Sequence, residues 1–217
     1  MDKTNRIAAL FDFDGVVMDT ETQYSKFWKM QGNNYHPEIV NFELLIKGQT
    51  LDQIYCKYFA GMTDVQETIQ KELNKFEEEM AYEFIPGVLD FVGELRSLKV
   101  YTAVVTSSNE AKMSNVYKAH PRMKELFDHI VVANDFVNSK PDPECFLLGA
   151  KKLGAIPENC FVFEDSFHGL EAGKRAGMTV IALSTTNSYE LVRDKANLVI
   201  SDFREFSYDK MLAAKTR

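Results

Sequence analysis

The stretch LFDFDGVVMDT, residues 10–20, places two aspartates two positions apart at the end of an apolar run. In an extended chain, residues i and i+2 point the same way, so Asp12 and Asp14 can face one site beyond the carboxyl end of a strand. Charge at the tip of a buried strand is costly unless it is paired or serves a ligand. A strand that ends in an Asp-Gly turn explains DFDG equally well. Whether the two aspartates belong to a functional site therefore depends on the residues at the other strand ends of the sheet.

Short apolar runs rich in β-branched and aromatic residues recur along the chain and alternate with segments of helical spacing. The predicted strands are residues 7–13, 100–106, 129–133, 160–165 and 179–184, with a sixth candidate at 197–200. Because these runs are apolar almost throughout, we expect strands that are buried on both faces of a parallel sheet. Helices are predicted over residues 86–99 and 142–155, the second with Gly154 as its C-cap. This alternation predicts a doubly wound α/β fold.

One interval interrupts the alternation. Residues 21–84 contain no convincing strand, and their segments TLDQIYCKYFAGM and DVQETIQKELNKFEEEMAYEF have helical spacing, the second with Asp64 as its predicted N-cap. A connection this long is uncommon inside a compact sheet. We therefore expect residues 20–86 to form an inserted α-helical cap, and residues 1–19 and 87–217 to form the core. The alternative is that these helices are layers of a single domain.

Composition disfavours several classes of function. The 217 residues carry a net charge of -7 and no basic stripe, which argues against a nucleic-acid partner. No apolar run approaches the roughly 20 residues of a membrane span, and residues 1–6 are polar, unlike a signal peptide. We therefore expect no membrane association and a cytoplasmic protein. The three cysteines form no C-x-x-C pair, so neither a disulfide framework nor a zinc site is indicated.

Hydroxyl groups follow the second predicted strand. Thr106, Ser107 and Ser108 precede a helix that is expected to begin near Asn109. Hydroxyls together with free backbone N–H groups at a helix start can bind phosphate. An ordinary N-cap would explain Ser108 or Asn109 alone, but it explains Thr106 less well. This strand end is therefore a candidate phosphate site.

The fourth predicted strand ends in a second acidic pair, Glu164 and Asp165, and the loop before it carries Lys140. A loop lysine is usually solvated, but here it can balance carboxylates from neighbouring strand ends. Mg²⁺ prefers oxygen ligands such as Asp12 and Asp165. A carboxylate can attack phosphorus to form an aspartyl-phosphate, and Asp14 can exchange protons with the leaving group and with water. These residues together predict magnesium-dependent phosphoryl transfer.

The segments DFDGVVMDT, TSSN, SKPDPE and EDSFHGLEAGKRAGM resemble the four motifs of the haloacid dehalogenase superfamily. Their order and spacing are similar to those of its β-phosphoglucomutase-like phosphatase branch. The resemblance extends from Leu10 to about Ala182 and implies a Rossmann-like core with a helical, C1-type cap inserted after the first motif. Each motif is weak alone, whereas all four in order are specific.

The resemblance also implies roles for individual residues. It implies that Asp12 is the nucleophile, that Asp14 is the general acid/base, and that Thr106 and Lys140 bind phosphate. Ser107 is a further phosphate-binding candidate because its hydroxyl follows Thr106 at the same strand end. The magnesium site that it implies comprises Asp12, the main-chain carbonyl of Asp14, Asp165 and, in a supporting outer position, Glu164.

Substrate choice is expected to rest with the cap. The residues expected to face the active site are Tyr24, Trp28, Lys47, Gly48 and Gln49. Tyr24 and Trp28 lie four positions apart on one helical face, and packing inside the cap explains that aromatic pair at least as well as substrate contact does.

The choice between phosphatase and mutase depends on departures from the family pattern. β-Phosphoglucomutases carry a histidine twelve positions after the nucleophile and an arginine shortly after the KG loop, where this chain has Tyr24 and Leu51. A mutase must hold both ends of a bisphosphate, for which a bidentate arginine is best suited. No arginine occurs between Arg6 and Arg96, although a cap lysine can substitute as a point charge.

We therefore predict a phosphatase that acts on a small phosphorylated metabolite, with sugar phosphates as the leading class. A β-phosphoglucomutase-type mutase is the alternative. A non-catalytic phosphate-binding protein is a third candidate, but it predicts a broken catalytic position, and none of the motif positions is broken. The sequence does not specify an oligomeric state, and a monomer is the default expectation.

Overall fold

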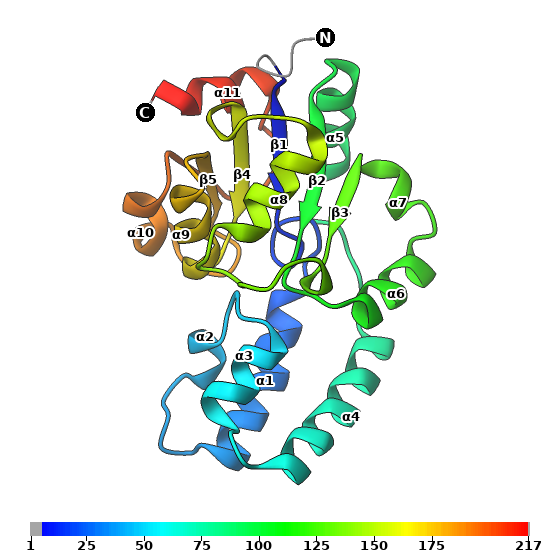
Figure 1. Ribbon diagram of the computed structural model, residues 1–217, viewed down its shortest axis with the longest axis vertical. Coiled ribbons are helices and arrows are strands. Elements are labelled where there is room, and N and C mark those ends of the chain that lie inside the picture. The colour runs from blue at the N-terminus through cyan, green and yellow to red at the C-terminus, as the bar shows by residue number, and fades with distance from the viewer. Residues whose placement is uncertain (1–5, 217) are drawn as a thin grey trace.

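The computed structural model describes residues 6–216, so the polar segment before Arg6 lies outside the described residues. One sheet of six parallel strands, in the order β3-β2-β1-β4-β5-β6, forms its centre (Figure 1). The strands are β1 (Ala8–Phe11), β2 (Tyr101–Val105), β3 (His129–Val131), β4 (Cys160–Glu164), β5 (Thr179–Leu183) and β6 (Leu198–Ile200). The doubly wound parallel sheet is confirmed, and each strand is slightly shorter than predicted.

Successive residues of the central strands pack on opposite faces of the sheet. Ala9 and Phe11 of β1 belong to one apolar core, whereas Ala8 and Leu10 belong to a second core on the other face. Phe11 also stacks on Phe163 of β4, with ring centroids 4.6 Å apart. Burial on both faces explains why these strands are apolar almost throughout.

Helices cover both faces of the sheet (Figure 1). Those that contribute to the core around Phe11 are α5 (Val88–Ser97), α6 (Glu110–Ala119), α7 (Met123–Leu126) and α11 (Tyr208–Ala213). Those that contribute to the opposite core are α8 (Glu144–Leu153), α9 (Phe167–Arg175) and α10 (Tyr189–Val192). Gly154 ends α8 in the left-handed conformation (φ 67°) that favours glycine, which confirms the predicted C-cap. Single 3-10 turns are Ala133–Asp135, Pro157–Asn159, Arg193–Lys195 and Ala214–Thr216.

Four helices lie beyond the carboxyl ends of the strands, at the bottom of Figure 1. They are α1 (Glu21–Tyr35), α2 (Phe42–Leu45), α3 (Leu51–Tyr58) and α4 (Thr63–Glu79). These helices share an apolar cluster of their own, which includes Phe27, Phe42, Phe59 and Ile69. A separate cluster is what an inserted unit requires, and it supports the proposal that residues 20–86 form a cap on the core.

The predicted N-cap of the fourth helix is wrong. Met62 occupies the N-cap position without a side-chain hydrogen bond, and Asp64 lies inside the first turn of α4. Gly61 has a positive φ of 77°, and the chain turns there directly into the helix. The helix therefore begins before Asp64 can cap it, although an acidic residue in the first turn still interacts favourably with the helix dipole.

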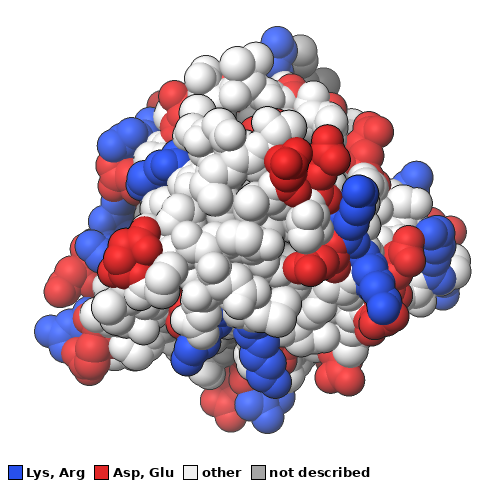
Figure 2. All heavy atoms as spheres, turned by 90° about the horizontal axis from the view of Figure 1, so that it is seen from below, with Lys and Arg blue, Asp and Glu red and all other residues white. Residues whose placement is uncertain are grey.

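Figure 2 shows the molecule from the side of helices α1 to α4. Acidic and basic side chains alternate around the margin of this face, and few charges lie in its middle. On the part of the chain that the structure describes, this face carries no basic stripe of the kind that binds a nucleic-acid backbone. No helix within residues 6–216 has the length and apolar character needed to cross a membrane.

We expect Phe11→Ala to destabilise the protein strongly, because Phe11 is fully buried and contacts several rings of its core. Truncating a buried phenylalanine typically lowers the free energy of unfolding by about 3–5 kcal/mol. The control is Phe167→Ala, whose side chain is 41% exposed and which should cost about 0.5 kcal/mol or less. Urea unfolding measures both variants. Similar losses in the two would contradict the assignment of Phe11 to the central core.

Candidate active site

A pocket of about 690 Å³ opens between the carboxyl ends of the strands and helices α1 to α4. It brings together most of the residues singled out from the sequence: Asp12, Asp14, Tyr24, Trp28, Lys47, Gly48, Gln49, Thr106, Ser107 and Asp165. Lys140 and Glu164 are also buried next to this pocket. Lys140 pairs with the Asp12 carboxylate, and a Glu164 oxygen lies within 4.8 Å of an Asp12 oxygen. Residues from three strand ends and from the inserted helices thus converge on one cavity.

Asp12 and Lys140 form the buried centre of the site. The Asp12 backbone N–H donates to the Phe163 carbonyl (2.9 Å), which extends the pairing of β1 with β4 beyond the strand. Lys140 Nζ donates to Asp12 Oδ1 (2.6 Å), to Glu164 Oε1 (2.7 Å) and to the Val105 carbonyl (3.3 Å). Burial lowers the pKa of Lys140, but the two carboxylates outweigh burial and raise it above its ordinary value. Lys140 is therefore a fixed cation between three strand ends.

Negative charge is concentrated beside this lysine. One oxygen from each of Asp12, Glu164 and Asp165 lies within 4.8 Å of the others. Burial raises the pKa of Asp12 to about 7, against the opposing effect of Lys140. Burial, with the carboxylates of Glu21, Glu164 and Asp12, raises the pKa of Asp165 well above its ordinary value. Crowded carboxylate oxygens are the donor set that a hard divalent cation prefers, so these residues fit such an ion.

Glu164 differs from the other two acids because donors already surround it. Its Oε2 accepts from the backbone N–H groups of Asp165 and Ser166 (2.8 Å each) and from Ser166 Oγ (3.0 Å). Its other oxygen accepts from Lys140. A Cβ on Gly169 would lie 1.7 Å from Glu164 Oε1, so only glycine lets α9 begin this close to the strand end. Glu164 thus orients the main chain that presents Asp165.

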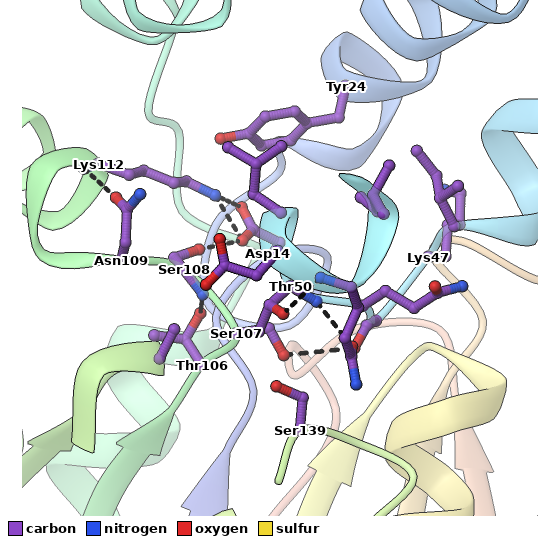
Figure 3. Close-up of a pocket in the computed structure, with 18 of the residues that line it drawn as sticks. Asp14, Tyr24, Lys47, Thr50, Thr106, Ser107, Ser108, Asn109, Lys112 and Ser139 are labelled. Carbon is purple, nitrogen blue, oxygen red and sulfur yellow. Dashed lines mark hydrogen bonds and ion pairs between the residues drawn. The ribbon is translucent and has the colours of Figure 1, made fainter. Parts of the chain in front are cut away.

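Asp14 is held by a separate set of donors (Figure 3). Lys112 Nζ lies 2.5 Å from each carboxylate oxygen, Ser108 Oγ donates to Oδ2 (3.0 Å), and the Thr20 hydroxyl donates to Oδ1. Lys112 lies in the first turn of α6 and is buried. Asp12 and Asp14 therefore reach the same pocket with different partners.

The turn between β2 and α6 supplies hydroxyl groups to the pocket. The Ser108 backbone N–H donates to Thr106 Oγ1 (3.0 Å), and Ser107 Oγ donates to the Gly48 carbonyl (3.3 Å). Asn109 caps α6 with its side chain, so neither Thr106 nor Ser107 is needed for capping. Figure 3 shows both hydroxyls at the pocket wall below Asp14.

The loop that carries Lys47, Gly48 and Gln49 touches the core directly. The His168 ring Nδ1 lies within hydrogen-bond distance of the Lys47 carbonyl (2.9 Å). Gly48 has a φ of 77°, and a Cβ there would lie 2.6 Å from Ser166 Oγ. Lys47 Nζ is paired with Glu21 Oε2 at 2.5 Å, so its charge is already balanced within the pocket. Gln49 lines the same wall.

The two aromatic candidates have different surroundings. Trp28 is 7% exposed and packs against Phe27 in the apolar cluster of α1 to α4, although part of it lines the pocket. Tyr24 is partly buried, and its hydroxyl donates to Glu77 Oε1 (2.8 Å). Packing within these helices therefore accounts for most of the Trp28 surface, whereas Tyr24 carries a polar contact at the pocket.

Residues 9–183 match the family model for haloacid dehalogenase-like hydrolases. The chain belongs to this family. It is 28% identical over 177 residues to the phosphorylated carbohydrates phosphatase of Thermotoga maritima, covering 79% of this chain and 82% of that protein. It is 29% identical over 204 residues to Suppressor of Quenching 1 of Arabidopsis thaliana, covering 90% of this chain and 19% of the length of that protein.

Solved structures share the fold of this hydrolase. The β-phosphoglucomutase of Clostridium difficile superposes with a TM-score of 0.80 at 24% sequence identity, over 97% of each chain. The family match confirms the superfamily expected from the four motifs, and the structural likeness shows that the two proteins share a fold.

The fold brings further charged residues to the pocket of this hydrolase that the motifs do not mark: Glu21, Glu43, Asp52, Glu77 and Lys112. For Lys112 a signal exists, because it follows the N-cap Asn109 by three residues and so lies in the helical turn that begins at the site. Glu21 directly follows the first motif. No local pattern marks Glu77, which reaches the pocket only because α4 packs beside α6.

The metal-free protein should lose stability as the pH rises from about 4 to about 7. Asp12 has an ordinary pKa of 3.8 and a folded pKa of about 7, so the folded state binds its proton more tightly than the unfolded chain does. Urea unfolding in EDTA at several pH values across this range measures the effect. Asp12→Asn should reduce the slope, and an unchanged slope in that variant would contradict the assignment to Asp12.

A divalent cation should stabilise the protein through Asp165. Binding to the folded state alone raises the free energy of unfolding by about 2.7 kcal/mol at a ligand concentration 100 times Kd. We expect Mg²⁺ to raise the melting temperature of EDTA-treated protein and Asp165→Asn to remove most of that rise. The control Asp194→Asn, whose side chain is 88% exposed, should keep the full effect. Equal responses in both variants would show that Mg²⁺ acts elsewhere.

Proposed function

We propose that this hydrolase is a magnesium-dependent phosphatase that acts on a small phosphorylated metabolite, with sugar phosphates as the substrate class. The observation that carries the proposal is the position of Asp12. Its carboxylate lies at the pocket, beside a buried cation and a cluster of acids that fits a divalent ion. The similarity to a phosphatase of phosphorylated carbohydrates supports the substrate class.

Asp12 and Asp14 have different roles in the proposed reaction. An Asp12 oxygen forms a bond to phosphorus while the bond from phosphorus to the ester oxygen breaks, and Asp14 gives that oxygen a proton. Water then attacks the phosphorus of the aspartyl-phosphate and gives a proton to Asp14. The bond from phosphorus to the Asp12 oxygen breaks in this step, so inorganic phosphate is released and the Asp12 carboxylate is restored. Two carboxylates with different partners can perform these two tasks, because their surroundings differ.

The phosphoryl oxygens need donors as negative charge is redistributed. In this proposal Lys140 and the Thr106 and Ser107 hydroxyls would donate to the phosphoryl oxygens, a role that their positions at and beside the pocket support. Asp12, Asp165 and the main-chain carbonyl of Asp14 would hold Mg²⁺, with Glu164 in support. Bound Mg²⁺ would neutralise part of the phosphate charge.

Helices α1 to α4, within residues 20–86, are proposed to act as the cap that selects the leaving group. One wall of the pocket comes from Tyr24 of α1 and from Lys47 and Gln49 in the loop between α2 and α3. Neutral amide and hydroxyl side chains of this wall and of the facing loops suit the hydroxyls of a sugar: Ser25, Gln49, Thr50, Gln53, Gln70 and Asn134.

The mutase alternative needs a second phosphate site. Among the described residues that line the pocket, the cations are Lys47 and Lys112, and no arginine is present. Each of these lysines already pairs with a carboxylate, Glu21 for Lys47 and Asp14 for Lys112. A distal phosphate would have to displace one of these partners, which supports a phosphatase. The structural likeness to β-phosphoglucomutase concerns the fold and does not supply the second site.

The decisive experiment measures phosphate release from a panel of phosphomonoesters, β-glucose 1-phosphate and pyrophosphate, in Mg²⁺ or in EDTA. We expect release from sugar phosphates that needs both Mg²⁺ and Asp12. Asp12→Asn removes the nucleophile, and the rate should fall by about 10³-fold or more. Asp194→Asn, far more exposed, is the matched control and should leave the rate unchanged.

Other outcomes would assign a different function. Conversion of β-glucose 1-phosphate to glucose 6-phosphate with a bisphosphate primer, faster than phosphate release, would establish a mutase. Binding of phosphate by folded, metal-loaded protein without turnover in either assay would establish a non-catalytic phosphate-binding protein.

A further inference from the structure

Lys112 is a buried lysine to which neither the family motifs nor the proposed chemistry gives a task. It lies in the first turn of α6 with 4% of its surface exposed, and its Nζ is 2.5 Å from both carboxylate oxygens of Asp14. Lysine is almost never buried unless it is paired, because an unpaired ammonium loses its hydration. The positions of this ammonium and this carboxylate therefore depend on each other.

The two aspartates of the first motif each have a lysine. Lys140 lies 2.6 Å from Asp12, and Lys112 lies 2.5 Å from Asp14. Lys140 precedes α8, which packs on one face of the sheet, whereas Lys112 belongs to α6 on the other face. Because the lysines come from opposite faces, each carboxylate is held from a different side. The two aspartates can therefore be oriented independently of each other.

The remaining contacts of Asp14 strengthen this orientation. Ser108 Oγ donates to the same carboxylate (3.0 Å), and so does the Thr20 hydroxyl. Lys112 is the charged member of this set and contacts both oxygens, so it restrains the rotation of the carboxylate most strongly. Without it, two hydroxyl groups alone would hold Asp14.

Lys112 also connects Asp14 to the inserted helices. Its Nζ lies 4.3 Å from the centroid of the Tyr24 ring, within the range of a cation–π interaction. The Tyr24 hydroxyl donates to Glu77 Oε1 of α4 (2.8 Å). Burial raises the pKa of Glu77, and the charge of Lys112 opposes that rise, which places Glu77 within the field of the lysine. Figure 3 shows Tyr24, Lys112 and Asp14 grouped on one side of the pocket.

We propose that Lys112 is a positioning residue for proton transfer, which fixes the direction of the Asp14 carboxylate and ties it through Tyr24 to the placement of helices α1 and α4. This inference rests on the proposed phosphatase function and on the role of Asp14 in it. In this proposal the leaving oxygen takes its proton from Asp14 when the ester bond breaks, and Lys112 acts on that step only through Asp14. Its effect should therefore depend on how much the leaving group needs a proton.

Single-turnover kinetics with two substrates test this dependence. The p-nitrophenolate leaving group is stable without a proton, whereas the alkoxide of a sugar phosphate or glycerol 3-phosphate is not. We expect Lys112→Met to slow alcohol release by at least about 10-fold, because positioned acid–base catalysis contributes about 10²–10⁴-fold. Release of p-nitrophenolate should slow by about 3-fold or less. Lys112→Arg, which keeps the charge, should restore part of the alcohol-release rate.

Two controls separate positioning from a structural effect. Lys118→Met removes an exposed lysine from the same helix and should leave both rates unchanged. In the Asp14→Asn background, Lys112→Met should produce no further loss in alcohol release, because Lys112 acts through Asp14. Lys112→Arg retains the buried charge, so the test remains decisive if Lys112→Met does not fold.

Three outcomes would overturn the proposal: equal losses with both leaving groups, an additional loss in the Asp14→Asn background, or a change in KM without a change in kcat. The last would mean that Lys112 binds substrate directly. Failure of the proposed function is distinguishable, because wild-type protein would then show no Asp12-dependent release of p-nitrophenolate in Mg²⁺.

Discussion

Buried negative charge at one edge of the sheet is the constraint on which this structure depends. Asp12, Glu164 and Asp165 lie within a few ångströms of one another, where each carboxylate has lost most of its hydration. Lys140 offsets part of that charge, and the carboxylates that remain crowded together are a donor set that fits a divalent cation. Apolar residues at these positions would stabilise the fold at least as well, because buried ion pairs contribute little net stability.

The two-sided architecture of the sheet makes this arrangement feasible. Helices on both faces bury the strands. Lys140, in the loop before α8, reaches Asp12 from one side, and Lys112 of α6 reaches Asp14 from the other. The contacts between the inserted helices and the core include polar ones, such as the Gly48 loop against Ser107 and Ser166, and apolar ones, in which Tyr24 and Phe76 pack against the sheet core. Tyr24 and Phe76 also pack against the apolar cluster of the helices, so these two side chains join that cluster to the sheet core beside the pocket.

Much of the fold can be predicted from local patterns. The six strands follow from apolar runs, since burial on both faces removes the alternation that a half-exposed strand would show. Gly154 as a C-cap follows from the φ that the helix end requires. The N-cap at Asp64 fails because the turn at Gly61 starts the helix earlier, and a capping residue cannot be distinguished from a first-turn acid by sequence alone.

The class of chemistry can be inferred from the chain alone, because four motifs place carboxylates, hydroxyls and a lysine at strand ends and parallel strands bring their ends to one edge of the sheet. The pairing of these charges becomes visible in the folded protein. Lys112 with Asp14, and Lys47 with Glu21, come from segments distant in sequence. Such pairings depend on how helices pack and on how much water each carboxylate loses, and neither quantity is encoded in a local pattern.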